Sequence, residues 1–328
     1  MLEYTPEQQR AVVANWKQFN AAQTALDAAQ NGGLIGNAFA LPRDVWQRWE
    51  TEAVGIQRNV LAVFDDLSGS LSAPIGIGET VNNFMTVTDS GEVNVSLDGR
   101  SSALGDQPVF DYHGTPVPII DTAFNYGWRQ VEAARSKGFQ LDAAGRANAT
   151  RKVAERMETL ALDGDSKIKV GGSQLYGIRT HPKRNTRSTG VTLNGATGVQ
   201  WLAEVIALVK LLHADNFRVA PTLYLNWDDW FYAQNTDYST NYPNKSIAQR
   251  VQEIGIASVV PASKVSADEM IAVVKSREVI QVLNAMPPST IAKFRANMTD
   301  DYAFTRMAAT AVEVRYDSED NCGIAHSS

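Results

Sequence analysis

The chain has 328 residues, of which 44% are hydrophobic, so it has enough apolar material for an ordered core in one elaborated domain or two. Thirty lysines and arginines stand against 36 aspartates and glutamates, which gives a formal net charge of -6 and an isoelectric point of about 5.3. A sequence-reading nucleic-acid binder is usually basic, so this balance disfavours that class.

The single cysteine, Cys322, excludes an intramolecular disulfide framework and a cysteine-based metal site, and it fits a reducing compartment. The opening MLEYTPEQQR lacks the basic and apolar regions of a signal peptide. No stretch reaches the roughly 18 consecutive apolar residues of a membrane span. We therefore expect a chain that neither carries a secretion signal nor crosses a membrane.

Two helices are predicted first. Thr5, Pro6 and Gln8 occupy the N-cap, N1 and N3 positions of a capping box, and apolar residues follow at roughly helical spacing up to Leu26. The segment Asn31-Gly32-Gly33 ends this helix, because these residue types tolerate positive φ. A second helix is predicted from about Arg43 to Phe64, closed by Gly69 and Pro74.

Residues 72–118 lose helical periodicity and indicate a projecting β-hairpin. Met85 and Val87 alternate with polar residues, as do Val93, Val95 and Leu97, and Asp89-Ser90-Gly91 has the composition of a three-residue hairpin loop. A two-stranded ribbon is marginal alone in water. We therefore expect this hairpin to pack on something else, for which a neighbouring subunit is a candidate.

The clearest predicted helix spans 142–163, with Asp142 as its N-cap and a stop at Asp163-Gly164. Its apolar stripe is narrow, which predicts a half-buried helix lying across a thin body. The stripe consists of Val153, Met157, Leu160 and Ala161.

The second half predicts an amphipathic helix around 201–212, then a strand over 217–225 and a short helix capped by Asn226. Short strands are expected at 254–260, 270–274 and 279–283, with Pro287-Pro288 marking an edge, and at 302–307 and 311–316 before a polar tail. The overall class is α+β.

The sequence offers few candidates for catalytic or metal-binding residues. The histidines, at 113, 181, 213 and 326, show no metal-ligand spacing such as H-E-x-x-H, so we expect no catalytic, metal or cofactor role for them. His213 lies near a predicted helix end, where it can interact with the free backbone carbonyls. Three glycine clusters lack a phosphate-loop pattern and indicate turns. Asp228 and Asp229 point about 100° apart on a helix and suit its positive end.

A basic stretch could contact an anion, but it lacks the interleaved aromatic residues of single-strand binders. A solvated loop or an intersubunit charge contact is the favoured interpretation. Its members are Lys167, Lys169, Arg179, Lys183, Arg184 and Arg187. Trp16, Trp46, Trp49 and Trp128 suit core packing or aromatic anchors at interfaces.

The order of elements resembles the Hong Kong 97-type fold of tailed-phage major capsid proteins and the related encapsulin shells. The stretch from Val219 to Trp230 is similar to the family's entry into the axial domain, a strand followed by a capped helix, and Pro118 to Asp165 is similar to its passage from extended loop into spine helix. The ending Tyr302 to Tyr316 is similar to its last peripheral-domain strands.

The resemblance implies an N-terminal arm over 1–71, an extended loop over 72–118, a peripheral domain over 119–215 and 287–328 with the spine helix 142–163, and an axial domain over 216–286. It implies pentamers and hexamers in a virion shell that is assembled in the host cytoplasm and then packed with double-stranded DNA, which it contacts non-specifically. Portal, scaffolding and possible cement proteins are the implied partners. Some members join a lysine of the extended loop to a neighbour's asparagine. Residues 72–118 contain no lysine, so no such bond is expected through that loop.

Three alternatives remain open. An encapsulin-like shell has the same fold and holds a cargo enzyme; a long N-terminal helix favours the viral subunit. A soluble α+β enzyme would need a convergent set of His, Cys or carboxylate residues that the sequence does not provide. A nucleic-acid-binding module is disfavoured by the acidic balance.

Overall fold

The computed structural model describes residues 5–29, 62–91, 93, 95, 97, 107–137, 141–239 and 241–328. The chain divides into two compact units, Met1–Glu50 and Thr51–Ser328. The first contains α1 (Pro6–Ala29), which confirms the first predicted helix. The predicted stop at residues 31–33 and most of the predicted second helix lie outside the described residues.

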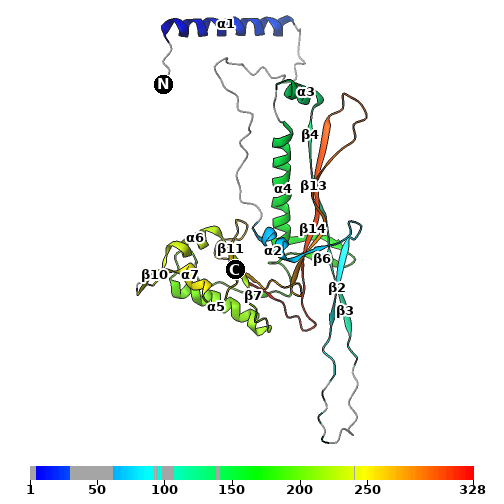
Figure 1. Ribbon diagram of the computed structural model, residues 1–328, viewed down its shortest axis with the longest axis vertical. Helices are drawn as coiled ribbons and strands as arrows, with labels where there is room; N and C mark the ends of the chain where they lie inside the picture. Colours follow the sequence, from blue (N-terminus) through cyan, green and yellow to red (C-terminus); the bar gives the residue numbers. More distant parts are fainter. Residues whose placement is uncertain are drawn as a thin grey trace. The chain divides into compact units, whose positions relative to one another are not determined.

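In the second unit, a four-stranded sheet has the order β1 (Ser72–Pro74), β13 (Ile280–Ala292), β14 (Tyr302–Val314), β4 (Ile119–Tyr126) (Figure 1). The antiparallel β13 and β14 form its long hairpin, paired from Ile280 with Val314 to Ala292 with Phe304. The two strands predicted at 302–307 and 311–316 are thus one continuous strand, because β14 pairs along its length with β13 and β4.

Pro287 and Pro288 lie inside β13 and do not mark its edge, which corrects the prediction. The register of β13 against β14 shifts between Met286 and Ser289, where the prolines stand. A bulge accommodates residues that cannot donate to the ladder, so the strand continues past them.

The helix α4 (Leu141–Asp163) lies against β4 and β14 and confirms the predicted spine-type helix. Its predicted apolar stripe is buried. Asp142 is not the N-cap, because Leu141 is already helical. Gly164, at φ 65°, ends the helix; a Cβ there would lie 2.4 Å from the Leu175 carbonyl oxygen. A further helix, α3 (Trp128–Lys137), was not predicted.

The short helix α2 (Val63–Leu71) belongs to the core of the second unit. Four of its apolar side chains are buried: Val63, Phe64, Leu67 and Leu71. The last part of the predicted N-terminal arm, residues 63–71, therefore packs with residues of α4.

The second sheet has five strands in the order β11 (Ser258–Pro261), β8 (Thr222–Leu225), β12 (Met270–Val273), β15 (Ile324–Ser327), β7 (Asn185–Arg187). Every residue of β8, β12 and β15 is buried. The predicted polar tail is wrong over 324–327, because these residues form β15, which lies between β12 and β7.

Three helices accompany this sheet: α5 (Gly198–Ala214), α6 (Trp227–Asn235) and α7 (Ile247–Gln252), with a small sheet of β9 (Asp237–Ser239) and β10 (Tyr242–Ser246) (Figure 1). Asn226 caps α6 as predicted, its side chain accepting from the Asp228 N–H. Two strands of this sheet, β7 and β15, come from the segments that the sequence assigned to the peripheral domain. The limits of the five-stranded sheet therefore do not coincide with the predicted domain boundaries.

The projecting hairpin is present, but its second strand differs from the prediction. β2 (Val81–Val87) pairs antiparallel with β3 (Phe110–Pro116), and not with residues 93–97. Val93, Val95 and Leu97 are at least 91% exposed, so none of the described residues buries the apolar side of this alternation. A second hairpin, β5 (Gly164–Val170) and β6 (Ser173–Tyr176), contacts β3.

Candidate functional site

The β2–β3 ribbon has two unlike faces. Met85 stands opposite Tyr112, and Val87 opposite Phe110, so these four side chains share one face. They are 45–68% exposed, and we call them the apolar ribbon face. No element among the described residues covers them. Side chains that pair across strands in this way, each an aromatic with an aliphatic group, normally pack against a neighbouring element or molecule.

The opposite face holds the ribbon to the rest of the unit. Phe84 and His113 stand opposite each other, and both contact the ring of Tyr316, which follows β14. The ring centroids lie 5.7 Å apart for Phe84 and Tyr316 and 4.8 Å apart for His113 and Tyr316. The ribbon is therefore fixed at its root by aromatic contacts and leaves its other face open.

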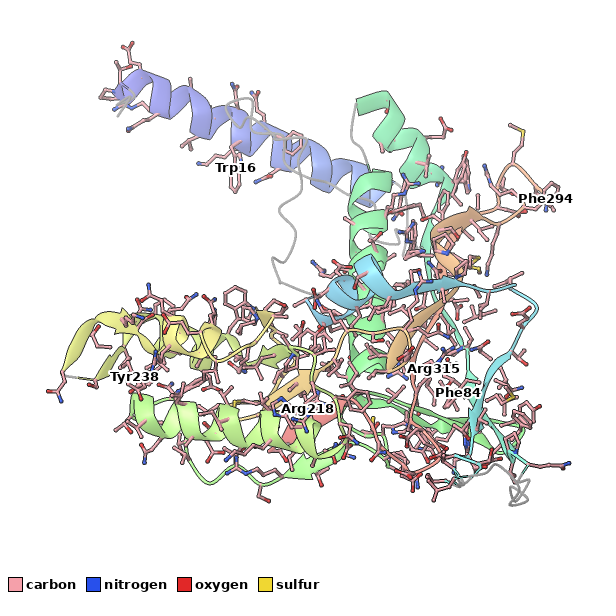
Figure 2. The ribbon with its side chains drawn as sticks, turned by 60° about the horizontal axis from the view of Figure 1, so that its bottom comes forward. Trp16, Phe84, Arg218, Tyr238, Phe294 and Arg315 are labelled. Atoms are coloured by element: carbon pink, nitrogen blue, oxygen red, sulfur yellow. The ribbon has the colours of Figure 1, made fainter. Side chains whose placement is uncertain are left out.

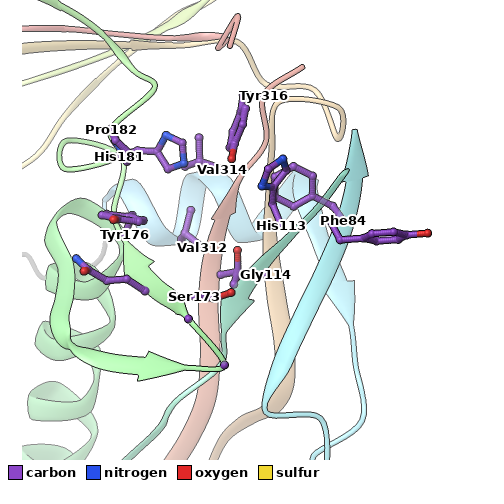
Figure 3. A pocket seen from close by; sticks show the side chains of 15 residues that line it. Phe84, His113, Gly114, Ser173, Tyr176, His181, Pro182, Val312, Val314 and Tyr316 are labelled. Carbon is purple, nitrogen blue, oxygen red and sulfur yellow. The ribbon is translucent and has the colours of Figure 1, made fainter. Parts of the chain in front are cut away.

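A cavity of about 410 Å³ lies at this root (Figure 3). Tyr176 and His181 form its other wall, and the His181 ring lies 5.5 Å from that of Tyr316. Burial lowers the pKa of His181 to about 4, helped by the charges of Arg184 and Lys183. His181 is therefore neutral at pH 7.

Gly114 explains how β3 approaches β6 so closely. A Cβ on this residue would lie 2.5 Å from the Ser173 hydroxyl oxygen and 2.6 Å from the Asn83 side-chain oxygen. Only glycine fits without a shift of these neighbours, so the ribbon root depends on this position.

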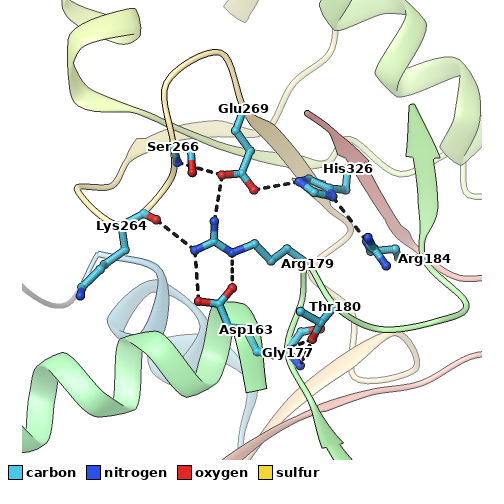
Figure 4. Close-up of polar contacts among 9 residues, drawn as sticks. All are labelled: Asp163, Gly177, Arg179, Thr180, Arg184, Lys264, Ser266, Glu269 and His326. Carbon is cyan, nitrogen blue, oxygen red and sulfur yellow. Dashed lines mark hydrogen bonds and ion pairs between the residues drawn. The ribbon is translucent and has the colours of Figure 1, made fainter. Parts of the chain in front are cut away.

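A charged hub of Asp163, Arg179, Glu269 and His326 joins the end of α4 to the five-stranded sheet (Figure 4). The Arg179 guanidinium donates to Glu269 at 3.0 Å and forms an ion pair with Asp163. His326 Nε2 lies 2.8 Å from Glu269 Oε1. The hub thus ties three segments that are distant in sequence.

The hub has a defined protonation pattern. Arg184 Nε donates to His326 Nδ1 at 3.4 Å, so Nδ1 accepts and the proton of a neutral ring sits on Nε2, which donates to Glu269. Burial opposes ionisation of Glu269, but hydrogen bonds from His326 and the Ser266 N–H and the charge of Arg179 outweigh it and lower its pKa. Glu269 is therefore a carboxylate.

Three of the six basic residues form ion pairs within the chain, which the prediction of a solvated loop or an intersubunit contact did not include. Besides Arg179, Lys183 pairs with Asp320 and Arg187 with Glu204. Lys167 and Lys169 alone of the six remain exposed without an ion pair among the described residues. Part of the basic stretch thus stabilises contacts within the chain. The sequence could not reveal this, because the acidic partners lie far from these residues in the sequence.

Buried polar contacts also attach α2 to the rest of the unit. Both carboxylate oxygens of Glu158, on α4, accept from the backbone of α2, at 3.0 Å from the Val63 N–H and 2.9 Å from the Phe64 N–H. Asp66 accepts from the Tyr224 hydroxyl and pairs with Lys275. Glu158 takes the place of an N-terminal capping side chain, satisfying donors that a helix start leaves free.

The two adjacent acidic residues at the start of α6 differ in their surroundings. Asp228 is exposed, whereas Asp229 is 1% exposed and its carboxylate accepts from the Asp268 N–H. Asp229 therefore joins α6 to the loop before β12, in addition to its predicted place at the positive end of the helix. Burial raises the pKa of Asp229. Within the described ranges, no group of three His, Cys, Asp or Glu residues is placed to hold a metal ion. None of the described helices is long and apolar enough to span a bilayer.

The sequence profile of a family described as a family of unknown function, DUF6260, matches residues 36–327. The chain belongs to this family. None of the curated proteins matches its sequence.

Solved structures resemble this DUF6260 chain in fold. The capsid of Myoviridae phage XM1 is 14% identical, with a TM-score of 0.68 over 90% of this chain and 99% of that one. The capsid of a native GTA particle is 12% identical, with a TM-score of 0.59 over 90% and 99%. A virus-like particle from Pyrococcus furiosus is 11% identical, with a TM-score of 0.55 over 80% and 92%. The DUF6260 chain therefore has the Hong Kong 97-type fold that its sequence suggested.

Proposed function

We propose that this DUF6260 chain is the major capsid protein of a tailed bacteriophage. In this proposal it assembles as pentamers and hexamers into an icosahedral head shell around double-stranded DNA. The chain acts as a structural subunit and not as an enzyme, in the host cytoplasm and then in the virion. Portal, scaffolding and cement proteins are the further partners that this function implies.

The observation that carries the proposal is the apolar ribbon face on a chain of this fold. A two-stranded ribbon gains too little free energy from its own contacts to be stable alone, and exposed aromatic side chains on one face commonly mark a contact with another molecule. A second copy would cover Phe110 and Tyr112, which are 50% and 68% exposed. Stable interfaces of obligate assemblies commonly bury more than about 2,000 Å².

An encapsulin-like shell that holds a cargo enzyme is the second candidate. The likeness to the Pyrococcus furiosus virus-like particle supports it as a fold, at a lower TM-score than that of the phage XM1 capsid. The two functions differ in what the particle contains, because one encloses DNA and the other a protein.

The first test is negative-stain electron microscopy of the purified chain beside its size-exclusion profile. Closed shells or capsomer rings are expected, and nuclease-protected DNA in particles from infected or induced cells would distinguish a phage head from an enzyme compartment. A monomer of 35.8 kDa under all assembly conditions would contradict the proposal.

The ribbon face supplies a matched pair of variants. Tyr112→Ser is expected to prevent shell formation, whereas Val199→Ser, at a residue that is 60% exposed on α5, should leave it intact. Both variants should keep the circular dichroism spectrum of the original chain, since neither residue is buried. Shells from Tyr112→Ser equal in yield to the original would argue against the ribbon's role.

A further inference from the structure

The proposed function gives no role to the cavity of about 410 Å³ at the ribbon root (Figure 3). Its volume falls within the range of small-molecule sites, which is roughly 300–1,000 Å³. The residues that line it come from β2, β3, β6 and β14 and from the segments that follow β6 and β14. We call this space the root cavity.

An arc of neighbouring aromatic rings lines the root cavity. The ring centroids of Tyr176 and His181 lie 5.6 Å apart, and those of His181 and Tyr316 lie 5.5 Å apart. The arc continues from Tyr316 to His113, at 4.8 Å, and ends at Phe84 of β2, whose centroid lies 5.4 Å from that of His113 (Figure 2). Aromatic rings have negative faces, which attract the weakly positive C–H groups of a ligand. The root cavity can therefore hold the flat, C–H-bearing side of a small ring.

His181 places an unused hydrogen-bond donor in the root cavity. Its Nδ1 accepts from the Lys183 N–H at 3.3 Å, so the proton of the neutral ring sits on Nε2. Nε2 has no hydrogen-bond partner among the described residues, although His181 is only 7% exposed. A buried donor without a partner is uncommon in folded proteins, and its desolvation costs free energy. An oxygen atom of a ligand would satisfy this donor.

Five further polar side chains line the root cavity without a side-chain hydrogen bond to any of the described residues. They supply four hydroxyl groups and one amide, all of which can both donate and accept. They are Thr115 on β3, Ser173, Gln174 and Tyr176 on β6, and Tyr316. Because these groups come from facing sides of the cavity, they suit a compact ligand that carries hydroxyl groups around its edge.

The root cavity favours an uncharged ligand. None of the described residues that line it is an aspartate, a glutamate, a lysine or an arginine. The two cations beside His181 are already engaged, since Lys183 pairs with Asp320 and Arg184 donates to the His181 carbonyl at 2.9 Å. A charged ligand would lose its hydration without gaining a partner of opposite charge.

We propose that the root cavity binds a neutral saccharide unit. The apolar side of the sugar ring lies on the aromatic arc, a sugar oxygen accepts from His181 Nε2, and sugar hydroxyl groups form hydrogen bonds with Tyr176 and Tyr316. Aromatic surfaces also bind proline-rich peptides, but these lie along extended grooves. The inference goes beyond the proposed function and does not depend on it, because one subunit contains the whole cavity.

Saturation-transfer NMR with neutral sugars tests the site on the full chain. The probes are glucose, galactose, mannose and N-acetylglucosamine, each as a monosaccharide and as a disaccharide. At least one should bind with a Kd of about 1 mM or tighter, and its ring C–H signals should be the most strongly saturated because they lie on the aromatic arc. A disaccharide that binds more tightly than its monosaccharide would support a polysaccharide as the source of the unit, and equal binding would support a free sugar.

Absence of saturation for every sugar would overturn the saccharide site, and so would binding of a polyproline peptide in place of the sugars. Both results would leave the proposed shell function standing. Failure of the chain to form particles would contradict the shell function instead, without bearing on sugar binding by the subunit.

Conservative variants locate the binding. Tyr316→Phe and His181→Phe keep an aromatic ring but remove a hydroxyl group or an N–H donor, so each should raise the Kd about threefold or more. His213→Phe makes the same substitution at an exposed histidine on α5 and should leave the Kd unchanged. Circular dichroism checks that the variants fold, and Tyr316→Phe removes no hydrogen bond among the described residues. An unchanged Kd in Tyr316→Phe and His181→Phe would place the sugar elsewhere and overturn the proposal.

Discussion

The five-stranded sheet and the β2–β3 ribbon carry similar apolar strands but meet opposite surroundings. Leu223 and Leu225 of β8 are no more than 1% exposed, whereas Val87 and Phe110 of the ribbon are 45% and 50% exposed. The sheet finds its covering helices and its neighbouring strands within one chain. Among the described residues, the ribbon contacts the rest of the unit at its root and leaves its apolar face uncovered. An apolar strand pattern therefore does not by itself show where its partner lies.

Truncation at matched positions should separate the two regions most strongly. Leu223→Ala removes a fully buried side chain and should lower the free energy of unfolding by about 2–5 kcal/mol. Val87→Ala in the ribbon should change it by about 0.5 kcal/mol or less. Urea unfolding of unassembled subunits, followed by circular dichroism, measures both. Equal losses would mean that the ribbon is covered within the chain.

The charged hub belongs, like the five-stranded sheet, to the region whose side chains find their partners within one chain. Arg179→Met leaves Glu269 and Asp163 without their cation and should cost about 3 kcal/mol, since a mostly buried carboxylate loses its partner. Arg250→Met removes one of the two cations beside Glu253, leaves Lys245 in place, and should scarcely change the free energy of unfolding, because this ion pair is exposed to solvent. Similar unfolding free energies for the two variants would deny the hub a stabilising role.

Acid should weaken the ribbon root through His181. Its pKa is about 4 in the folded chain and roughly 6.5 when unfolded, so below about pH 6.5 only the unfolded chain takes up the proton. Stability should fall by on the order of 3 kcal/mol as the pH drops from 6.5 toward 4. His181→Gln should remove this component, measured as the pH dependence of urea unfolding. An unchanged slope between pH 6.5 and 4.5 would refute the assignment.

The smallest expected effect concerns the start of α2. Glu158→Gln keeps the size of the side chain but replaces one of its two acceptor oxygens, so either Val63 or Phe64 loses the partner of its N–H. The expected cost is about 1–2 kcal/mol. Hydrogen exchange at these two amides should accelerate more than at α5, whose Thr197 and Gln200 capping box is untouched. Uniform acceleration would indicate global loosening instead.

Local patterns in the sequence were enough to predict the main helices and the fold. The period of Val153, Met157 and Leu160 identifies α4, and Asn226 identifies the start of α6. These signals depend only on residues within a few turns of each other. The fold class followed from their order, and the solved structures confirm it.

The errors concern partners that lie far away in the sequence. The strand over 110–116 contains Gly114, Asp111 and Pro116 and lacks clean alternation, so Val93 and Val95 seemed the better match for β2. His326 and Ser327 are polar, and their burial depends on hydrogen bonds to residues far away in the sequence, such as Glu269 and Thr189. No local periodicity reports such pairings.

The position of β15 also bears on how the chain is made. Both neighbours of this strand, β7 and β12, leave the ribosome before it, so the gap between them stays open while translation continues. Until residues 324–327 emerge, each neighbour presents an unpaired strand edge, which is prone to aggregate. A polypeptide that lacks residues 324–327 should therefore keep both of these strand edges unpaired.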